Sequence, residues 1–160
     1  MEAVAAWASA LESSAFGMWA RGSSYAYPFA NLVHLLGLVM VVGGIGLLDL
    51  RLAGFFRALP VQAMWRVLTP FGIVGVVLLA ASGFTMFAAD AGPLVRAEVF
   101  QRKMVLIVLA LANAAAYRVF WRRHAATWDQ TAPTAARALA LTSLMLWMTV
   151  AAFGRLIAYT

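Results

Sequence analysis

The stretch YPFANLVHLLGLVMVVGGIGLLDLRLAGFF, residues 27–56, decides the fold of this 160-residue chain. The apolar run that it continues, residues 22–48, contains no Asp, Glu, Lys or Arg. Because roughly 20 apolar residues are enough for a helix to cross about 30 Å of hydrocarbon, this run predicts a membrane-spanning helix. Two features need an explanation: a histidine inside the run, His34, and the charged residues Asp49 and Arg51 at its end.

The composition is that of a membrane protein. Hydrophobic residues make up 64% of the chain, charged residues make up 11%, and the mean hydropathy is +0.87. Soluble domains are roughly half apolar and a quarter charged. The length suits a single bundle of spans without a second domain. The absence of cysteine excludes disulfides, thiolate metal sites and cysteine nucleophiles.

Three further runs predict spans: residues 68–89, the run between Lys103 and Arg118, which extends to about Trp121, and the run between Arg137 and Arg155. Backbone groups in lipid are satisfied only in helices or closed barrels, and these long runs do not alternate as barrel strands do. Residues 1–22 place apolar side chains at helical spacing and polar ones on other faces, which predicts an amphipathic surface helix rather than a frayed leader. The predicted fold is an all-α integral membrane four-helix bundle, residues 23–160, preceded by this surface helix.

Four spans place both termini on one side of the membrane. Of the Lys and Arg residues, seven lie in the two loops on the other side, and five lie on the terminal side. The positive-inside rule then predicts a multi-pass protein of the bacterial inner membrane with both termini outside. The basic, aromatic stretch at residues 117–124 meets the inner membrane edge, where anionic lipid is the expected partner and nucleic acid is not.

Small residues on three spans predict close packing between helices, because they let two backbones approach each other. These residues are Gly37, Gly43, Gly44 and Gly46 on the first span, Gly72 and Gly75 on the second, and Ala110 and Ala114 on the third.

Polar or soft side chains mark a candidate pocket. Depths counted at 1.5 Å per residue place one such side chain from each span in the outer half of the membrane. They are His34, Ser82, Asn113 and Met148. Three roles of His34 stay open: a hydrogen bond to Asn113 or Ser82 that joins helices, ligation of haem b or a related tetrapyrrole, and a metal-binding or proton-relay role. Met148 is either core filler or an axial ligand.

His34 cannot share one haem with the other histidine, His124, because His124 follows the inner end of the third span. Ligation by two histidines would need His34 from two copies of the chain. Within one protomer, a haem would have His34 and Met148 as ligands or would be five-coordinate.

The charged end of the first span is expected at the inner interface, where Asp49 and Arg51 can reach the headgroups. Pairing of Asp49 with Arg66 or Arg118 would hold the helix ends together. We therefore expect a structural ion pair here rather than substrate recognition.

Two segments, FANLVHLLGLVMVVGGIGLLDLRLAG (residues 29–54) and VFQRKMVLIVLALANAAAY (residues 99–117), resemble a family of small four-span bacterial inner-membrane proteins. That family is known chiefly as a domain of unknown function, so the resemblance implies the four spans and no activity. A looser similarity is to four-helix cytochrome b and copper-resistance membrane proteins, although this chain lacks paired intramembrane histidines. The positions that match the family pattern are His34, Asp49, Arg51, Phe100, Lys103 and Asn113.

The motifs of common enzymes are absent from the sequence. It has no glycine-rich phosphate loop, no His-Glu-x-x-His and no Gly-x-Ser-x-Gly, and no two carboxylates share a span. We therefore expect no autonomous enzyme but a non-catalytic membrane subunit of a larger, redox-linked complex, with His34 facing a cofactor or a partner. The alternatives are a small channel or carrier and a purely structural protein. The expected partners are lipid, other membrane subunits or a second copy of the chain.

Overall fold

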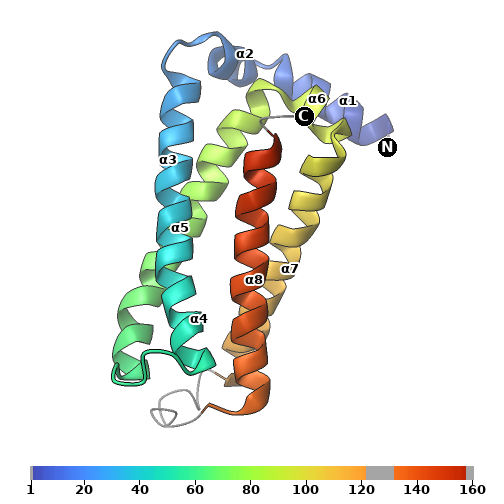
Figure 1. Ribbon diagram of the computed structural model, residues 1–160. Coiled ribbons are helices and arrows are strands. Elements are labelled where there is room, and N and C mark those ends of the chain that lie inside the picture. The colour runs from blue at the N-terminus through green and yellow to red at the C-terminus, as the bar shows by residue number, and fades with distance from the viewer. Residues whose placement is uncertain (1, 122–131, 158–160) are drawn as a thin grey trace.

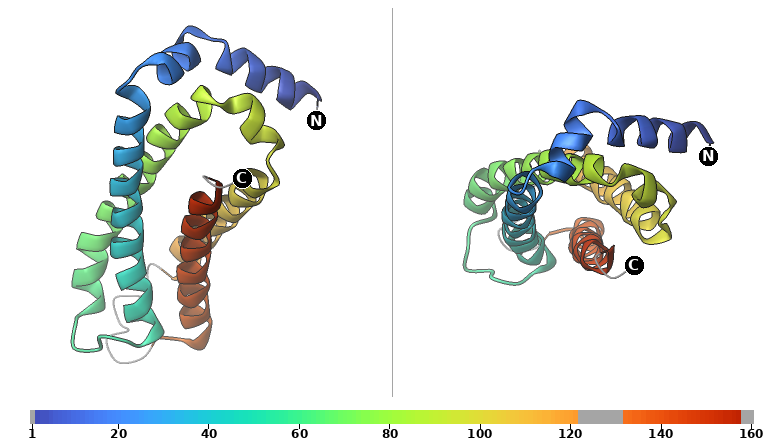
Figure 2. Two further views of the ribbon diagram at one scale, coloured as in Figure 1. Left: turned by 45° about the horizontal axis from the view of Figure 1, so that its top comes forward. Right: turned by 90° about the horizontal axis from the view of Figure 1, so that it is seen from above.

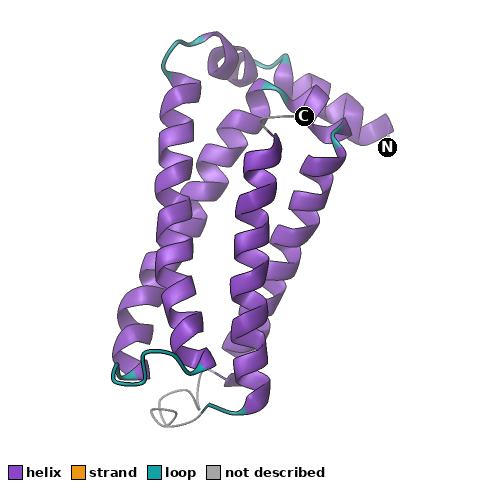
Figure 3. Ribbon diagram, in the orientation of Figure 1, coloured by secondary structure: helices purple, strands orange, loops and turns teal. Residues whose placement is uncertain are grey.

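A computed structural model describes residues 2–121 and 132–157, and helices dominate them, with no strand among these residues. The all-α prediction is confirmed (Figure 3). In chain order the elements are α1 (Glu2–Glu12), α2 (Ala15–Gly22), α3 (Ala26–Met40), the π-helix η1 (Val41–Ile45), α4 (Gly46–Ala53), α5 (Val61–Ala89), α6 (Ala91–Arg96), α7 (Glu98–Trp121) and α8 (Thr134–Leu156).

Four of the helical segments are long and apolar enough to cross a membrane, as predicted. They are Ala26–Ala53, which joins α3, η1 and α4, and then Val61–Ala89, Glu98–Trp121 and Thr134–Leu156. Large apolar side chains cover their outward faces, for example Val39 at 66%, Val108 at 65% and Met145 at 66% exposed. In water such exposure would be unfavourable, whereas in a bilayer these side chains meet lipid.

The four spans form two pairs (Figure 1). Helix α3 packs along α5, and α7 packs along α8, while α4 joins the two pairs through its contact with α8. The view along the bundle shows the α3–α5 pair on one side and the α7–α8 pair on the other (Figure 2). Helix α1 and the end of α8 lie at the same end, which we call the terminal end; the opposite end is the loop end.

Glycines bring α3 and α5 together at backbone distance. A methyl group added at Gly37 would lie 2.8 Å from the carbonyl oxygen of Gly75, too close for any real side chain. Gly44 and Gly72 also face close neighbours, whereas Gly43 has open space around it. The predicted packing role therefore holds for these glycines but not for Gly43. On α7, Ala110 is buried but its predicted companion Ala114 is exposed.

The first span contains an irregular turn that the sequence did not predict. The π-helix at Val41–Ile45 includes the adjacent glycines Gly43 and Gly44. Facing it, α5 carries Pro70, which cannot donate a backbone hydrogen bond to the preceding turn. π turns are rare in proteins, and those that occur are often found at functional sites. This one lies one turn before Asp49.

The N-terminal segment consists of two helices instead of the single predicted helix. The break falls at Ser13 and Ser14, where the Ser14 hydroxyl accepts a hydrogen bond from the Gly17 amide (3.1 Å) and begins α2. Serine is a strong N-cap residue, so it ends one helix and starts the next. Ala8 and Ala20 are fully buried, which ties α1 and α2 to the terminal end of the bundle.

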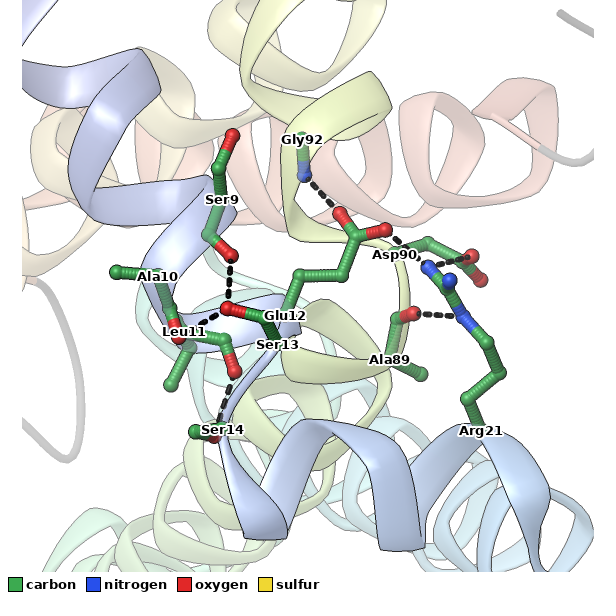
Figure 4. Close-up of polar contacts among 10 residues, drawn as sticks. All are labelled: Ser9, Ala10, Leu11, Glu12, Ser13, Ser14, Arg21, Ala89, Asp90 and Gly92. Atoms are coloured by element: carbon green, nitrogen blue, oxygen red, sulfur yellow. Dashed lines mark hydrogen bonds and ion pairs between the residues drawn. The ribbon is translucent and has the colours of Figure 1, made fainter.

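Polar contacts hold these two helices against the α5–α6 turn (Figure 4). Glu12 forms an ion pair with Arg21 and accepts a hydrogen bond from the Gly92 amide (2.7 Å), and Arg21 donates to the Ala89 carbonyl (2.7 Å) and to Asp90 (3.1 Å). The Gly92 amide and then the Arg21 guanidinium keep the pKa of Glu12 below its ordinary value. The network leaves an open cavity of about 260 Å³ beside Glu12 and Arg21.

Candidate functional site

Two of the four predicted pocket residues meet between α3 and α5. The Nδ1 atom of His34 lies 3.0 Å from the Oγ atom of Ser82, 48 residues further along the chain. Ser82 is buried, at 4% exposed, and His34 is half-buried. This contact is the interhelical hydrogen bond that was one of the predicted roles of His34.

The hydrogen-bond network assigns the tautomer of His34. The Ser82 hydroxyl has one hydrogen, and it donates this hydrogen to the carbonyl of Leu78, 2.5 Å away. When the hydroxyl donates to Leu78 it accepts from His34, and in that arrangement the Nδ1 atom carries the proton. The neutral imidazole then has its free lone pair on Nε2, the nitrogen that can bind a metal or accept a proton.

A third member of this site is Lys103, on α7. Helix α7 packs on α8 and not closely on α3, so Lys103 acts on the His34 imidazole by its charge and not by a contact. Glycines adjoin both residues: a methyl group added at Gly83 would lie 3.2 Å from the Cε1 atom of His34, and one added at Gly154 would lie 3.4 Å from the Nζ atom of Lys103. We call His34, Ser82 and Lys103 the histidine site. The sequence named Lys103 only through the family resemblance.

The other two predicted pocket residues lie elsewhere. Met148 is 50% exposed on α8, so it is not enclosed with His34. Asn113 donates from Nδ2 to the Leu139 carbonyl of α8 (3.1 Å). Because α7 begins at Glu98 and not near Lys103, Asn113 lies roughly 22 Å along the helix, toward the loop end. The prediction of one shared layer was wrong for Asn113 because the depth was counted from a lysine inside the span.

The charged end of the first span is enclosed by the protein. Asp49 is 6% exposed and Arg51 is 3% exposed, so neither reaches the headgroups as the sequence predicted. The reason is that α4 packs against α8, while Arg51 donates to the carbonyl of Leu59 (2.6 Å) in the loop that folds beneath it. Within residues 2–121 and 132–157, Asp49 forms no ion pair with Arg66 or Arg118, contrary to the prediction.

Asp49 instead lies beside two hydroxyl groups from other helices. Leu48 and Leu52, on either side of Asp49 in α4, pack in one cluster with Tyr117 of α7 and Ala140 of α8, and Ser143 is buried one turn further along α8. Asp49 acts electrostatically on Tyr117 and Ser143. The Tyr117 ring stacks on Trp65 of α5, with the ring centroids 5.4 Å apart. We call Asp49, Tyr117 and Ser143 the aspartate site. Its residues come from α4, α7 and α8, and Trp65 of the remaining span, α5, stacks on Tyr117.

The sequence reasoning missed Tyr117 and Ser143 as site residues. A signal for Ser143 was present, because the buried residues of α8 follow helical spacing and a serine interrupts this otherwise apolar face. The buried residues of α8 are Ala136, Ala140, Ser143, Trp147 and Val150. Tyr117 had been read as part of the basic, aromatic stretch at the membrane edge. Of that stretch, Arg122, Arg123 and His124 lie outside the described residues.

In the part of the chain that the structure describes, no group of three or more His, Asp or Glu side chains could hold a metal ion. His34 thus supplies a single nitrogen ligand.

The fold and the two sites define a class of protein: an all-helical bundle with four helices long and apolar enough to cross a membrane, and with polar side chains between them. No protein-family model, no curated protein and no solved structure matches the chain. The resemblance to the four-span bacterial family stays a prediction.

Proposed function

We propose that this protein is a non-catalytic membrane subunit of a redox-linked complex and that His34 binds haem b or a related tetrapyrrole. The observation that carries the proposal is the hydrogen bond from His34 Nδ1 to Ser82 (3.0 Å), which leaves the Nε2 lone pair free. Histidines that bind metals almost always donate their other ring N–H to a neighbouring acceptor, which fixes the ring and strengthens the ligand. Ser82 has this role here.

Lys103 adds a reason to favour a tetrapyrrole. Its charge acts on His34 through space, and such a cation would pair with a carboxylate of the bound ligand. Met148 is half-exposed and is not the second axial ligand in this proposal. The iron would have one ligand from this chain, and any second ligand would come from a partner subunit or from a second copy.

The location belongs to the same proposal. Helix α1 and the end of α8 lie at the terminal end of the bundle (Figure 1), and the loop end carries Arg57, Arg66 and Arg137. By the positive-inside rule, the loop end faces the cytoplasm of a bacterial cell and both termini face outward. The histidine site then lies in the outer half of the inner membrane, where a redox partner could approach.

The test is the absorption spectrum of protein expressed with ample haem. The wild type should show a Soret band that shifts on reduction with dithionite. His34→Ala should abolish the band, and Ser82→Ala should weaken haem affinity by about 10- to 100-fold. Met148→Leu is the matched control and should keep the band. A colourless, well-folded wild type would refute the haem site and leave His34 as a helix-joining residue.

One observation favours a second candidate, a small channel or carrier. Asp49 and Arg51 are buried and Lys103 is half-buried within the helices that are long enough to span a membrane, so the bundle interior holds more charge than the sequence indicated. Charged residues inside membrane spans are costly and mark ion or substrate pathways. Ion flux into proteoliposomes above that of protein-free vesicles would support this candidate.

A further inference from the structure

The carboxylate of Asp49 has no cation to balance it. The side chain is 6% exposed, and in the described residues no lysine or arginine pairs with it. Arg137, on the adjacent helix α8, is engaged elsewhere, since it donates twice to the Ala53 carbonyl (3.1 and 2.9 Å). A charge removed from water without a partner is strongly unfavourable, so the carboxyl group must bind either a proton or a cation from outside the described chain.

Two oxygen atoms at this site also lack hydrogen-bond partners. They are Oδ2 of Asp49 and the hydroxyl oxygen of Tyr117, which is 7% exposed. The two groups are near enough for the carboxylate charge to act on the tyrosine, yet they do not bond to each other. Buried polar atoms are almost always satisfied, so two unsatisfied oxygens together indicate an additional ligand.

We propose that Asp49, Tyr117 and Ser143 form a binding site for a small monovalent metal cation, of which Na⁺ is the simplest example. The three side chains offer only oxygen atoms, which are the ligands of hard cations. One carboxylate balances one positive charge, so the site suits a monovalent rather than a divalent ion. A water molecule could satisfy the hydroxyl groups, but it could not neutralise the carboxylate.

The position in the fold is consistent with such a site. Asp49 lies one turn after the π-helix Val41–Ile45, and irregular backbone within membrane proteins is found where it lines an ion site or a cavity. The ligands come from α4, α7 and α8, so a bound cation would hold together the two helix pairs of the bundle. This site does not depend on haem binding at His34.

The test uses the purified full-length protein and NaCl as the probe. Thermal unfolding is followed while choline chloride is replaced by NaCl at constant ionic strength. The melting temperature should rise with Na⁺ and level off, because a ligand that binds only the folded state stabilises it. The uptake of radioactive sodium should saturate at one ion per chain.

Variants separate the site from general salt effects. Asp49→Asn should abolish the Na⁺ response, whereas Asp90→Asn, a change at a carboxylate that is 53% exposed, should keep it. Tyr117→Phe and Ser143→Ala should fold and should raise the Na⁺ concentration that gives half of the response by about tenfold, which corresponds to about 1.4 kcal/mol.

Equal melting temperatures in NaCl and choline chloride would overturn the proposal, as would an unchanged Na⁺ response in Asp49→Asn. A stability that responds to pH and not to Na⁺ would assign a proton to Asp49 and would also overturn it. None of these results depends on the Soret band, so the cation site and the haem site fail or succeed separately.

Discussion

At the scale of single residues, two of the polar side chains in the spans each have a specific partner on another helix. His34 donates to Ser82, and Asn113 donates to the Leu139 carbonyl of the neighbouring helix. Lipid offers no hydrogen bonds, so a polar group inside the membrane must find its partner within the protein. For His34, the partner does more than satisfy one nitrogen, because it also determines which nitrogen stays free.

The Asn113 hydrogen bond gives a prediction at this scale. Asn113→Leu should lower the free energy of unfolding in detergent by about 1 kcal/mol, because the variant loses a hydrogen bond between α7 and α8. Asn31→Leu is the control: Asn31 is exposed on α3, and its replacement should cause no loss. Equal stabilities of both variants and the wild type would mean that the Asn113 bond contributes nothing.

At the scale of elements, the first span is the one that organises the others. Its α3 part packs on α5 through Gly37 and Gly75, and its α4 part packs on α8. The π-helix between the two parts changes the direction in which side chains point, since a wide turn contains an extra residue. One helix can therefore face two different neighbours along its length.

The glycines of this span give a matched pair of variants. Gly37→Ala should destabilise the protein by about 1–3 kcal/mol, because the added methyl group meets the Gly75 carbonyl at 2.8 Å, and backbone cannot move aside easily. Gly43→Ala adds the same group to open space and should be neutral or stabilising by up to about 1 kcal/mol. Thermal unfolding of both variants in the same detergent measures the difference. A harmless Gly37→Ala would contradict the close contact between α3 and α5.

At the scale of the whole molecule, the two ends of the bundle are built differently. The terminal end is covered by α1, α2 and α6, which the contacts of Glu12 and Arg21 hold in place (Figure 4). At the loop end, Arg51 of α4 donates to the Leu59 carbonyl, and Arg137 of α8 donates to the Ala53 carbonyl at the end of α4. The arginines at the loop end thus donate hydrogen bonds to carbonyl groups of a helix end and a loop. This role is separate from the effect of their charge on the orientation in the membrane.

Reporter fusions test the proposed orientation. A reporter joined after Thr160 should behave as periplasmic, and one inserted in the loop at residues 54–60 should behave as cytoplasmic, because the loop arginines favour the cytoplasm. Cell-surface labelling of cysteines introduced at the same two places is an independent measurement. A cytoplasmic signal at residue 160 together with a periplasmic signal at residues 54–60 would reverse the orientation.

The sequence by itself determined that this is an all-α protein with four helices long and apolar enough to cross a membrane, because apolar runs of that length are visible in a sequence. The sequence also identified His34, Ser82 and the packing glycine Gly37. All three lie between α3 and α5, where the position along each helix is enough to predict the neighbour. Only the tertiary structure decided that Asp49 is buried in the part of the bundle that holds Tyr117 and Ser143, and that neither Met148 nor Asn113 lies with His34 and Ser82. Such neighbours depend on where each helix begins and on how it is rotated about its axis. Packing between helices sets both the start and the rotation of each helix. A π turn or a charged residue inside a span shifts the start or the rotation, yet the long apolar run that predicts the span looks the same.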